Sequence, residues 1–356
     1  MKALITAGGR GTRLRPITHT RNKHLIPIAN KPILHYALEY VAEAGIRDVG
    51  IIVNSTRDEV VERIGGGDAW GLRITYIPQE APLGLAHCVK ISRDFLGDEP
   101  FVFYLGDNMV VGGIKRFREE FESSGSDCHL TLARVKDPER FGVPELRDGR
   151  IVGIEEKPVE PKSTYAVSGI YFYTSAIFDA VNAIEPSARG ELEISDAHQY
   201  LLRENRIVTY SEITGWWKDT GLPVDLLEAN RLVLDHQEAR VEEGAGADDT
   251  STVVGRVVLQ KGARIVNSNV RGPAIIGEGT VVENSYIGPF TSIHNNCHVR
   301  NSEVEFSIVL TESRILDVGV RIEGSLIGCD AAVVRAGDKP RTHRFVLGDQ
   351  GAIELA

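Results

Sequence analysis

The chain has 356 residues, of which 42% are hydrophobic and 25% are charged, and its formal net charge is −10. This length predicts two domains, each large enough to bury its own core. An acidic chain without a block of lysine and arginine is poorly suited to coat nucleic acid or an anionic membrane, so we expect neither as a partner. Scattered cysteines and a short N-terminal apolar run predict a cytoplasmic protein without a signal peptide or membrane span.

Strand-like and helix-like segments alternate through the first 105 residues. Strands are expected at residues 2–7, 49–53, 73–77 and 101–105, and helices at 32–44, 57–64 and 83–95. This alternation favours βαβ units and an α/β fold with a mixed, mostly parallel sheet. Functional groups in such sheets lie beyond the carboxyl ends of the strands. The glycine-rich segment after the first strand and Asp107 after the fourth both have that position.

The middle of the chain has a more mixed pattern. Strands are expected near 128–135, 151–155 and 167–173, followed by a helix at 224–239. The acidic, glycine-containing segment after this helix has the composition of a linker. We therefore predict a first domain at 1–240, a linker at 241–250 and a second domain at 251–356.

The second domain repeats with a period of 17 residues. Three Asn-Ser pairs keep this interval, at 267–268, 284–285 and 301–302. Two aliphatic series keep it as well, namely Leu259, Ile276, Ile293, Leu310, Ile327 and Ile265, Val282, Val299, Leu316, Val333. Each period divides into three near-hexads, which predicts a triangular coil with one short strand per side. The pattern resembles the left-handed parallel β-helix of hexapeptide-repeat proteins, with about four coils before the register drifts after Val304.

The segment Gly8-Gly9-Arg10-Gly11-Thr12-Arg13 follows the first expected strand. Glycines here would let backbone N–H groups surround an anion without Cβ interference. Arg13 adds a planar fork for two phosphate oxygens, and Lys23 adds a mobile positive charge. The spacing differs from both the dinucleotide motif and the P-loop. A tight turn with solvated basic residues is the alternative, but together these groups could neutralise a triphosphate whose α–β bond is breaking.

This segment, followed by Lys23 and then Lys31-Pro32, resembles the signature of the sugar-nucleotide pyrophosphorylases, G-G-x-G-T-R-L-x-P with a later lysine and K-P. Further matching motifs occur in order over the first 230 residues: 76–79 (YIPQ), 84–86 (GLA), 105–108 (LGDN), 141–143 (FGV), 155–158 (EEKP), 190–194 (GELEI) and 217–221 (WKDTG). The resemblance is strongest to the thymidylyl-transferring branch in its longer form. It implies a Rossmann-like nucleotidyltransferase domain followed by a C-terminal left-handed β-helix, and coils of this kind favour a homo-oligomer.

The resemblance also implies a role for each matching residue. The triphosphate would lie against Gly8, Gly9, Gly11, Thr12, Arg13 and Lys23. Asp107 and Asp219 would hold Mg²⁺, an ion that prefers carboxylate oxygens. With Arg13 and Lys23, these two carboxylates would form the catalytic set.

The base and the sugar phosphate would occupy separate pockets under the same resemblance. Gln79 would recognise the pyrimidine edge, and Gly84 would let the base lie close to the backbone. The sugar-phosphate pocket would consist of Gly142, Glu156, Lys157 and Val167. His87 stands where relatives often carry glutamine. Taken alone, Gln79 is a surface residue, Asp107 a turn residue and Glu156-Lys157 a solvated charge pair.

The implied reaction joins glucose 1-phosphate to dTTP, giving dTDP-glucose for activated-sugar synthesis and releasing pyrophosphate. Because the attacking phosphate oxygen is already an anion, the reaction needs positioning and charge neutralisation more than a general base. Use of UTP is an alternative, since a pocket discriminates a single methyl group weakly. Acetyl transfer by the β-helix, through His294 or His298, is another, and a sugar-nucleotide-binding regulator without catalysis is a third.

Overall fold

The computed structural model describes residues 1–9, 11–335, 345 and 348–355. The chain divides into two compact units. The first comprises residues 1–9, 21–25 and 33–219, and the second comprises residues 11–20, 26–32 and the described residues from 220 onward. None of the helices in the described part is long and apolar enough to cross a membrane.

A seven-stranded sheet in the order β12-β8-β11-β6-β1-β4-β5 forms the centre of the first unit. Its strands are β1 (Lys2–Thr6), β4 (Asp48–Val53), β5 (Arg73–Pro78), β6 (Phe101–Leu105), β8 (Cys128–Arg134), β11 (Tyr165–Tyr173) and β12 (Val208–Glu212). β11 runs antiparallel to β6 and β8, and the other pairs in this sheet are parallel. The expected mixed, mostly parallel sheet is therefore confirmed.

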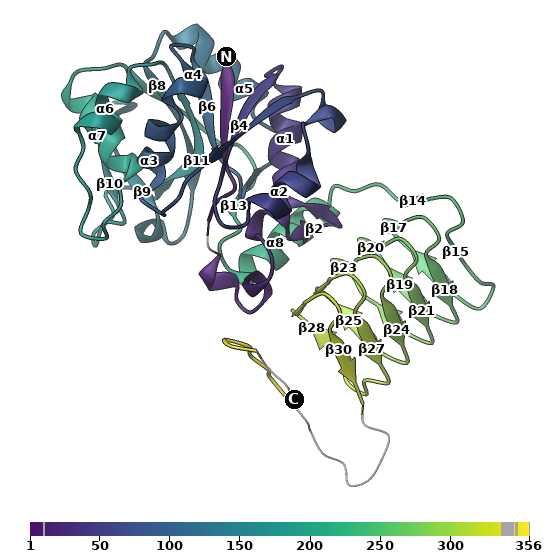
Figure 1. The fold of residues 1–356 in the computed structure, drawn as a ribbon. Coiled ribbons are helices and arrows are strands. Elements are labelled where there is room, and N and C mark those ends of the chain that lie inside the picture. Colours follow the sequence, from purple (N-terminus) through teal and green to yellow (C-terminus); the bar gives the residue numbers. More distant parts are fainter. Residues whose placement is uncertain (10, 336–344, 346–347, 356) are drawn as a thin grey trace. The chain divides into compact units, whose positions relative to one another are not determined.

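Helices cover both faces of this sheet (Figure 1). One face packs against α1 (Ile33–Glu43), α2 (Arg57–Ile64) and α5 (Lys115–Ser124). The other packs against α3 (Leu85–Ile91), α4 (Arg93–Leu96), α6 (Ile177–Ala183) and α7 (Ile194–Arg203). Ala3 and Ile5 of β1 face the first group and Leu4 faces the second, because successive strand side chains point to opposite faces.

The expected strands of the sheet and the helix at 57–64 are confirmed, but two helices differ from expectation. The helix expected at 83–95 is interrupted at Ser92, whose hydroxyl donates to the Cys88 carbonyl at 2.7 Å. A serine hydroxyl that bonds this carbonyl competes with the helical backbone bond. The helix expected at 224–239 is α8 (Pro223–Leu234), which ends earlier, and the chain passes through a turn before the strand that begins at Arg240.

Short ribbons and turns complete the first unit. β7 (Asn108–Val110) pairs with β13 (Trp217–Asp219), and β9 (Gly142–Arg147) pairs with β10 (Arg150–Glu156). The 3₁₀ turns here are η3 (Lys23–Leu25), η4 (Asp68–Trp70) and η5 (Pro138–Arg140). The chain runs outward from β1 to β4 and β5, then returns to the opposite side of β1 as β6. A reversal of strand order of this kind is where open α/β sheets bind ligands.

The second unit contains α8, the hairpin of β2 (Pro27–Ile28) and β3 (Lys31–Pro32), the turns η1 (Thr12–Leu14) and η2 (Ile17–His19), and a β-helix. Three parallel sheets form the sides of the β-helix. The first has β14 (Arg240–Val241), β17 (Val257–Leu259), β20 (Ala274–Ile276), β23 (Thr291–Ile293), β26 (Ile308–Val309) and β29 (Leu326–Ile327). The second has β15 (Gly246–Ala247), β18 (Arg264–Val266), β21 (Val281–Glu283), β24 (His298–Arg300), β27 (Arg314–Leu316) and β30 (Ala332–Val334). The third has β16 (Thr252–Val254), β19 (Asn269–Arg271), β22 (Tyr286–Ile287), β25 (Glu303–Glu305) and β28 (Ile322–Glu323).

The repeated Asn-Ser pairs form one corner of the coils. Asn267, Asn284 and Asn301 adopt φ values of 42°, 47° and 45°, a left-handed conformation that asparagine tolerates better than most residues. The serines stack from coil to coil, since the backbone N–H of Ser285 donates to the Ser268 hydroxyl at 3.0 Å. The expected left-handed β-helix is confirmed, and it exceeds four coils.

Two expected register positions are wrong. The 17-residue series places Leu310 opposite Ile293, but Val309 occupies that position. It also places Leu316 opposite Val299, where Ile315 lies instead. One coil is shorter by one residue here, so the aliphatic neighbour one position earlier turns inward.

The segment 241–250 is not a linker in this structure. β14 ends at its first residue, β15 lies in its middle, and the two strands pair in parallel with β17 and β18, so this segment belongs to the first coil of the β-helix. Its glycines and acidic residues serve as the corners of that coil, which gave it the composition of a linker. The predicted domain at 251–356 includes residues 336–344, 346–347 and 356, which lie outside the described residues.

Candidate active site

Polar residues and glycines gather where the parallel strands of the first unit end. Gly8 and Gly9 follow β1, Asn54 follows β4, Gln79 follows β5 and Asp107 follows β6. Because these four strands are parallel, their carboxyl ends share one edge of the sheet. The Asn54 side-chain amide donates to the Gly8 carbonyl and ties the first two loops together.

Lys23 and Asp107 form an ion pair at this edge. A Cβ at Gly9 would lie 2.7 Å from Cε of Lys23, so a side chain at this position would push the lysine away from Asp107. Asn108 Nδ2 also donates to Asp107 Oδ1 at 3.0 Å. Burial acts to raise the pKa of Asp107, but the Lys23 ammonium more than offsets this and holds that pKa well below its usual range. The site therefore contains a buried, ionised carboxylate next to a cation.

His24 lies behind this ion pair and has no role in our sequence analysis. It is 1% exposed and its Nδ1 lies 2.8 Å from the Asn22 side-chain oxygen. Burial, followed by the charge of Lys23, lowers the pKa of His24 to about 3, so the ring is neutral. Asn22 in turn donates to the Ala7 carbonyl at 2.7 Å. Asn22 and His24 thus hold the end of β1 in place, and the neutral His24 ring adds no positive charge beside Lys23.

The structure brings Asp219 to the same place. β13 pairs with β7 in a register that sets Asp219 opposite Asn108, the neighbour of Asp107. The ribbon is reinforced because Trp217 Nε1 donates to Asn108 Oδ1 at 2.8 Å. Asp219 therefore lies opposite the neighbour of Asp107 across the β7–β13 ribbon, and a shared role of the two carboxylates in metal binding stays a prediction.

The donor set at these two carboxylates fits a magnesium ion. Mg²⁺ is commonly held by one or two protein carboxylates, while substrate phosphates and water complete its shell. A site with three or more histidine, cysteine, aspartate or glutamate ligands does not occur among the residues that the structure describes. Two carboxylates suit a divalent ion that is shared with a phosphate ligand.

The predicted base-recognition residues also lie together. Gln79 is 9% exposed, and its Nε2 donates to the Gly84 carbonyl at 3.3 Å. The same nitrogen lies 3.1 Å from Nδ1 of His87 on α3. Gly84 has φ +100°, and a Cβ there would lie 2.7 Å from the backbone nitrogen of Leu192. Only glycine fits at this position.

Three of the four predicted sugar-phosphate residues form a second group, on the ribbon β9–β10. Glu156 ends β10, Gly142 begins β9 opposite it, and Lys157 Nζ lies 3.2 Å from Glu156. Ser195, near the start of α7, donates to Glu156 Oε2 at 2.7 Å, and a Cβ at Gly142 would lie 2.7 Å from that same hydroxyl. A side chain at position 142 would therefore displace Ser195.

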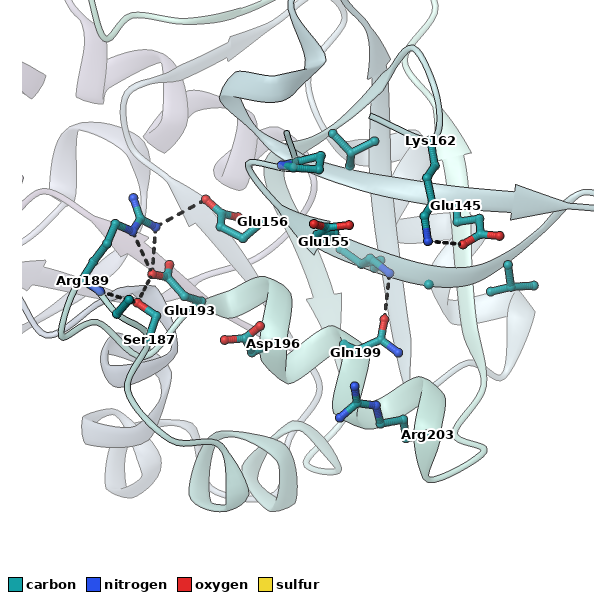
Figure 2. A pocket seen from close by; sticks show the side chains of 16 residues that line it. Glu145, Glu155, Glu156, Lys162, Ser187, Arg189, Glu193, Asp196, Gln199 and Arg203 are labelled. Atoms are coloured by element: carbon teal, nitrogen blue, oxygen red, sulfur yellow. Dashed lines mark hydrogen bonds and ion pairs between the residues drawn. The ribbon is translucent and has the colours of Figure 1, made fainter. Parts of the chain in front are cut away.

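Figure 2 shows how a further residue, Arg189, reaches Glu156. Arg189 lies 3.6 Å from Glu156 and donates to Glu193 Oε1 at 2.8 Å. Ser187 donates to Glu193 at 2.7 Å. These residues line a cavity of about 570 Å³ beside α7 and β10. Val167, the fourth predicted residue, is buried in β11 within the hydrophobic core, 7% exposed.

The β9–β10 ribbon lies close to the β7–β13 ribbon within the first unit. Phe141, which precedes Gly142, contacts Trp217 of β13 edge to face with ring centroids 5.4 Å apart. Burial, and then the negative charges of Glu156, Asp107 and Asp219, raise the pKa of the Tyr171 hydroxyl. The charges of all three carboxylates are therefore felt at one buried phenol on β11.

Gly11, Thr12 and Arg13 belong to the second unit. Gly11 has φ 61° and precedes η1, which contains Thr12 and an exposed Arg13. The Thr18 hydroxyl donates to the Gly11 carbonyl at 2.6 Å. Arg10 lies outside the described residues. The role of these three residues in phosphate binding stays a prediction.

Four supporting residues had no role predicted from the sequence: Asn22, His24, Ser195 and Arg189. Ser195 and Arg189 flank the matching segment 190–194, so their proximity to a motif was the available signal. Asn22 and His24 flank Lys23 and carried no motif of their own.

A mostly parallel sheet with glycines, Lys23 and Asp107 at its carboxyl edge and a polar cavity beside it is the arrangement expected of a nucleotidyltransferase. The model of the nucleotidyl transferase family matches residues 2–236. Glucose-1-phosphate thymidylyltransferases of Streptomyces griseus and Streptomyces antibioticus are each 53% identical over 357 residues, covering all of this chain and 100% and 99% of those proteins. The chain belongs to this family and, within it, to the long-form glucose-1-phosphate thymidylyltransferases with a C-terminal β-helix.

A solved structure supports the fold assignment. A Bacillus anthracis protein, provisionally assigned as a glucose-1-phosphate thymidylyltransferase, matches with a TM-score of 0.63 and 41% identity. The match covers 67% of this chain and 98% of that one.

Proposed function

We propose that this chain transfers the thymidylyl group of dTTP to glucose 1-phosphate, giving dTDP-glucose and pyrophosphate. The observation that carries this proposal is the meeting of Lys23, Asp107 and Asp219 at one edge of the sheet. The full-length similarity to thymidylyltransferases supports the choice of substrates.

The reaction forms a bond between a phosphate oxygen of the sugar phosphate and the α-phosphorus of dTTP, while the bond from that phosphorus to the bridging oxygen breaks. Pyrophosphate leaves with the bonding electrons. Lys23 offers a positive charge where the phosphates gather, and Arg13 would add a second, delocalised one. Gly8, Gly9, Gly11 and Thr12 would leave room for the triphosphate against the backbone. The nucleophile enters as an anion, so no residue needs to remove a proton.

Asp107 and Asp219 would hold Mg²⁺ together with phosphate oxygens. Nucleotidyltransferases of this family generally use a divalent metal, and two carboxylates with a shared phosphate suit magnesium. The bound ion would neutralise charge on the α-phosphoryl oxygens. Asn108 holds Asp107 by a hydrogen bond, while the β7–β13 ribbon holds Asp219 next to it.

Gln79 and Gly84 would receive the thymine, and the β9–β10 ribbon would receive the glucose phosphate. Glu156, with its oxygens fixed by Ser195 and Lys157, would accept hydrogen bonds from sugar hydroxyls. Lys157, whose ammonium lies beside the same carboxylate, would give up this ion pair and bind the phosphate of the sugar instead. Gly142, which has no side chain, would leave the sugar-phosphate pocket open. Val167 would support this pocket from β11.

The test is a pyrophosphate-release assay with glucose 1-phosphate and, separately, dTTP, UTP, dCTP, GTP and ATP in the presence of Mg²⁺. We expect the highest kcat/KM with dTTP and measurable turnover with UTP. Highest activity with ATP or GTP would contradict the assignment. Chelation with EDTA should abolish turnover, and added Mg²⁺ should restore it.

Acetyl transfer by the β-helix is less well supported. His294 Nδ1 lies 2.6 Å from the Thr311 hydroxyl, and His298 Nε2 lies 3.1 Å from Glu283. Both contacts join neighbouring coils, and two full-length relatives at 53% identity are thymidylyltransferases. Release of free CoA from acetyl-CoA and glucosamine 1-phosphate would reveal this activity, and we expect none above background.

The proposal includes a cytoplasmic location and self-association through the β-helix. All four cysteines are free thiols, and Cys88, Cys128 and Cys297 are buried. A reducing compartment suits this pattern. Sedimentation of the full-length chain would measure its oligomeric state directly.

A further inference from the structure

Gln79 has an amide whose orientation is fixed by a carbonyl group. The Gly84 carbonyl oxygen can only accept, so the Gln79 atom 3.3 Å from it must be the NH₂ group. The same NH₂ group lies 3.1 Å from His87 Nδ1. Because the NH₂ group cannot accept, this contact is a hydrogen bond only when His87 Nδ1 is the acceptor, which is the neutral tautomer with its proton on Nε2.

The Gly84 carbonyl is itself held in place. The Leu192 N–H donates to the Leu83 carbonyl at 2.8 Å, and the Ala86 N–H donates to the Leu192 carbonyl at 3.1 Å. These two bonds fix the backbone on both sides of Gly84, which adopts φ +100°. Burial, followed by the charge of Lys90, lowers the pKa of His87, which agrees with a neutral acceptor. Both acceptors that orient the amide are thus preset by the fold.

The consequence concerns the remaining atom of the amide. The Gln79 NH₂ group has two acceptors within the protein, so the atom left to bind a ligand is the carbonyl oxygen Oε1. Thymine and uracil present a donor at N3, whereas cytosine presents an acceptor at N3. An acceptor facing N3 attracts the first two bases and repels the third.

We propose that His87 is a positioning residue for nucleobase selection: by accepting from Gln79 it keeps Oε1 toward the base and thereby excludes cytosine. This inference rests on the proposed function, because it takes Gln79 as the residue that meets the pyrimidine. It adds a reason for the histidine at this position. His87 does not touch the base; it acts through Gln79.

Substitutions at position 87 separate the hydrogen-bonding role from simple packing. His87→Gln retains an acceptor that can receive the Gln79 N–H. His87→Met fills similar space without a comparable acceptor. His87→Lys carries only donors, so Gln79 would turn its Oε1 toward the lysine and its NH₂ toward the base.

The experiment measures dTTP and dCTP affinity by calorimetry with Mg²⁺, for the full-length wild type and the three variants. We expect the wild type and His87→Gln to prefer dTTP strongly. The preference should fall about 10-fold or more in His87→Lys and less in His87→Met, since an unmatched buried polar group is what rejects the wrong ligand. Thermal unfolding of each variant confirms that it is folded.

Each outcome decides a separate point. Equal affinity of the wild type for dTTP and dCTP overturns the inference, and so does an unchanged preference in a folded His87→Lys variant. A wild type that binds dTTP selectively but releases pyrophosphate only from a purine triphosphate would instead overturn the proposed function. Because binding is measured without turnover, the two failures are distinguishable.

Discussion

At the edge of the seven-stranded sheet, contacts join residues that are far apart in the sequence, whereas contacts between the coils of the β-helix join residues that are one repeat apart. At the sheet edge, Lys23 meets Asp107 across 84 residues and Trp217 meets Asn108 across 109. In the β-helix, Ser285 meets Ser268 across 17 residues, and the next coil repeats the contact. The site therefore depends on single side chains that no other residue duplicates, whereas the β-helix is stabilised by equivalent contacts that repeat from coil to coil. Substitutions at the site should therefore mainly lower activity, whereas substitutions in the β-helix should mainly lower stability.

The sharpest test removes one charge from the site. Asp107→Asn keeps the shape of the side chain but loses the carboxylate that pairs with Lys23. We expect kcat/KM for pyrophosphate release to fall by roughly 10²–10³-fold, the scale of losing one group that stabilises transition-state charge. Steady-state kinetics with dTTP and glucose 1-phosphate would measure it.

Asp48→Asn is the matched control, because Asp48 lies at the opposite end of the same sheet and pairs with Arg73 on the surface. Its kinetics should match the wild type. Unchanged turnover in Asp107→Asn would show that Asp107 is not a ligand of the metal ion.

The corresponding change in the β-helix should cost stability and spare chemistry. Ile276 is fully buried in β20, between coils on either side. Ile276→Ala should lower the free energy of unfolding by about 2–4 kcal/mol, as large-to-small core substitutions do. Urea unfolding measures the loss, while kcat/KM per folded molecule should stay within twofold.

Val254→Ala serves as the control, since Val254 is 56% exposed and its truncation should change stability little. A large fall in kcat for folded Ile276→Ala would break the comparison, because the coil would then contribute to catalysis.

The same contrast explains how much of the fold the sequence can predict. The coils repeat at a fixed interval, so three coincident series are enough to predict the β-helix from the amino-acid sequence alone. Where one coil is a residue short, the period misplaces Leu310 and Leu316, because a turn can lose a residue without leaving a periodic signal. The period also begins too late to show that β14 and β15 form the first coil.

The site was accessible to prediction only in part. Strand ends indicated where Gly8 and Asp107 would lie, since parallel strands end at one edge. No local pattern could pair Asp107 with Asp219, because the β7–β13 ribbon that joins them depends on tertiary packing. That pairing came from the family resemblance. His24 was missed because a buried neutral histidine and a solvated one look alike in sequence.

Acid should weaken the two regions unequally. The buried histidines among the described residues, His24, His129 and His198, all belong to the first unit. Burial lowers the pKa of His198 to about 3, against about 6.5 in an unfolded chain. Between these values the unfolded state binds the proton, so stability falls as pH drops below about 6.5. His198 alone should cost about 2 kcal/mol at pH 5 relative to pH 7.

His198→Gln removes the titration and can still accept from the Tyr173 hydroxyl, which lies 2.6 Å from His198 Nε2. Urea unfolding at pH 7 and pH 5 should show a smaller acid loss in this variant than in the wild type. His236→Gln, at an exposed position, is the control and should leave the acid loss unchanged. An equal loss in all three proteins would show that His198 is protonated in the folded chain.

The smallest effect tests the sugar side of the site. Ser195 donates to Glu156 at 2.7 Å, and Lys157 and Arg189 also hold that carboxylate. Ser195→Ala removes one of three partners, worth about 1 kcal/mol, so KM for glucose 1-phosphate should rise about 5-fold with kcat within twofold. Ser123→Ala, at an exposed position of α5, is the control. If KM for dTTP rose as much as KM for glucose 1-phosphate, Glu156 would serve the nucleotide rather than the sugar, and the separation of the two pockets would be wrong.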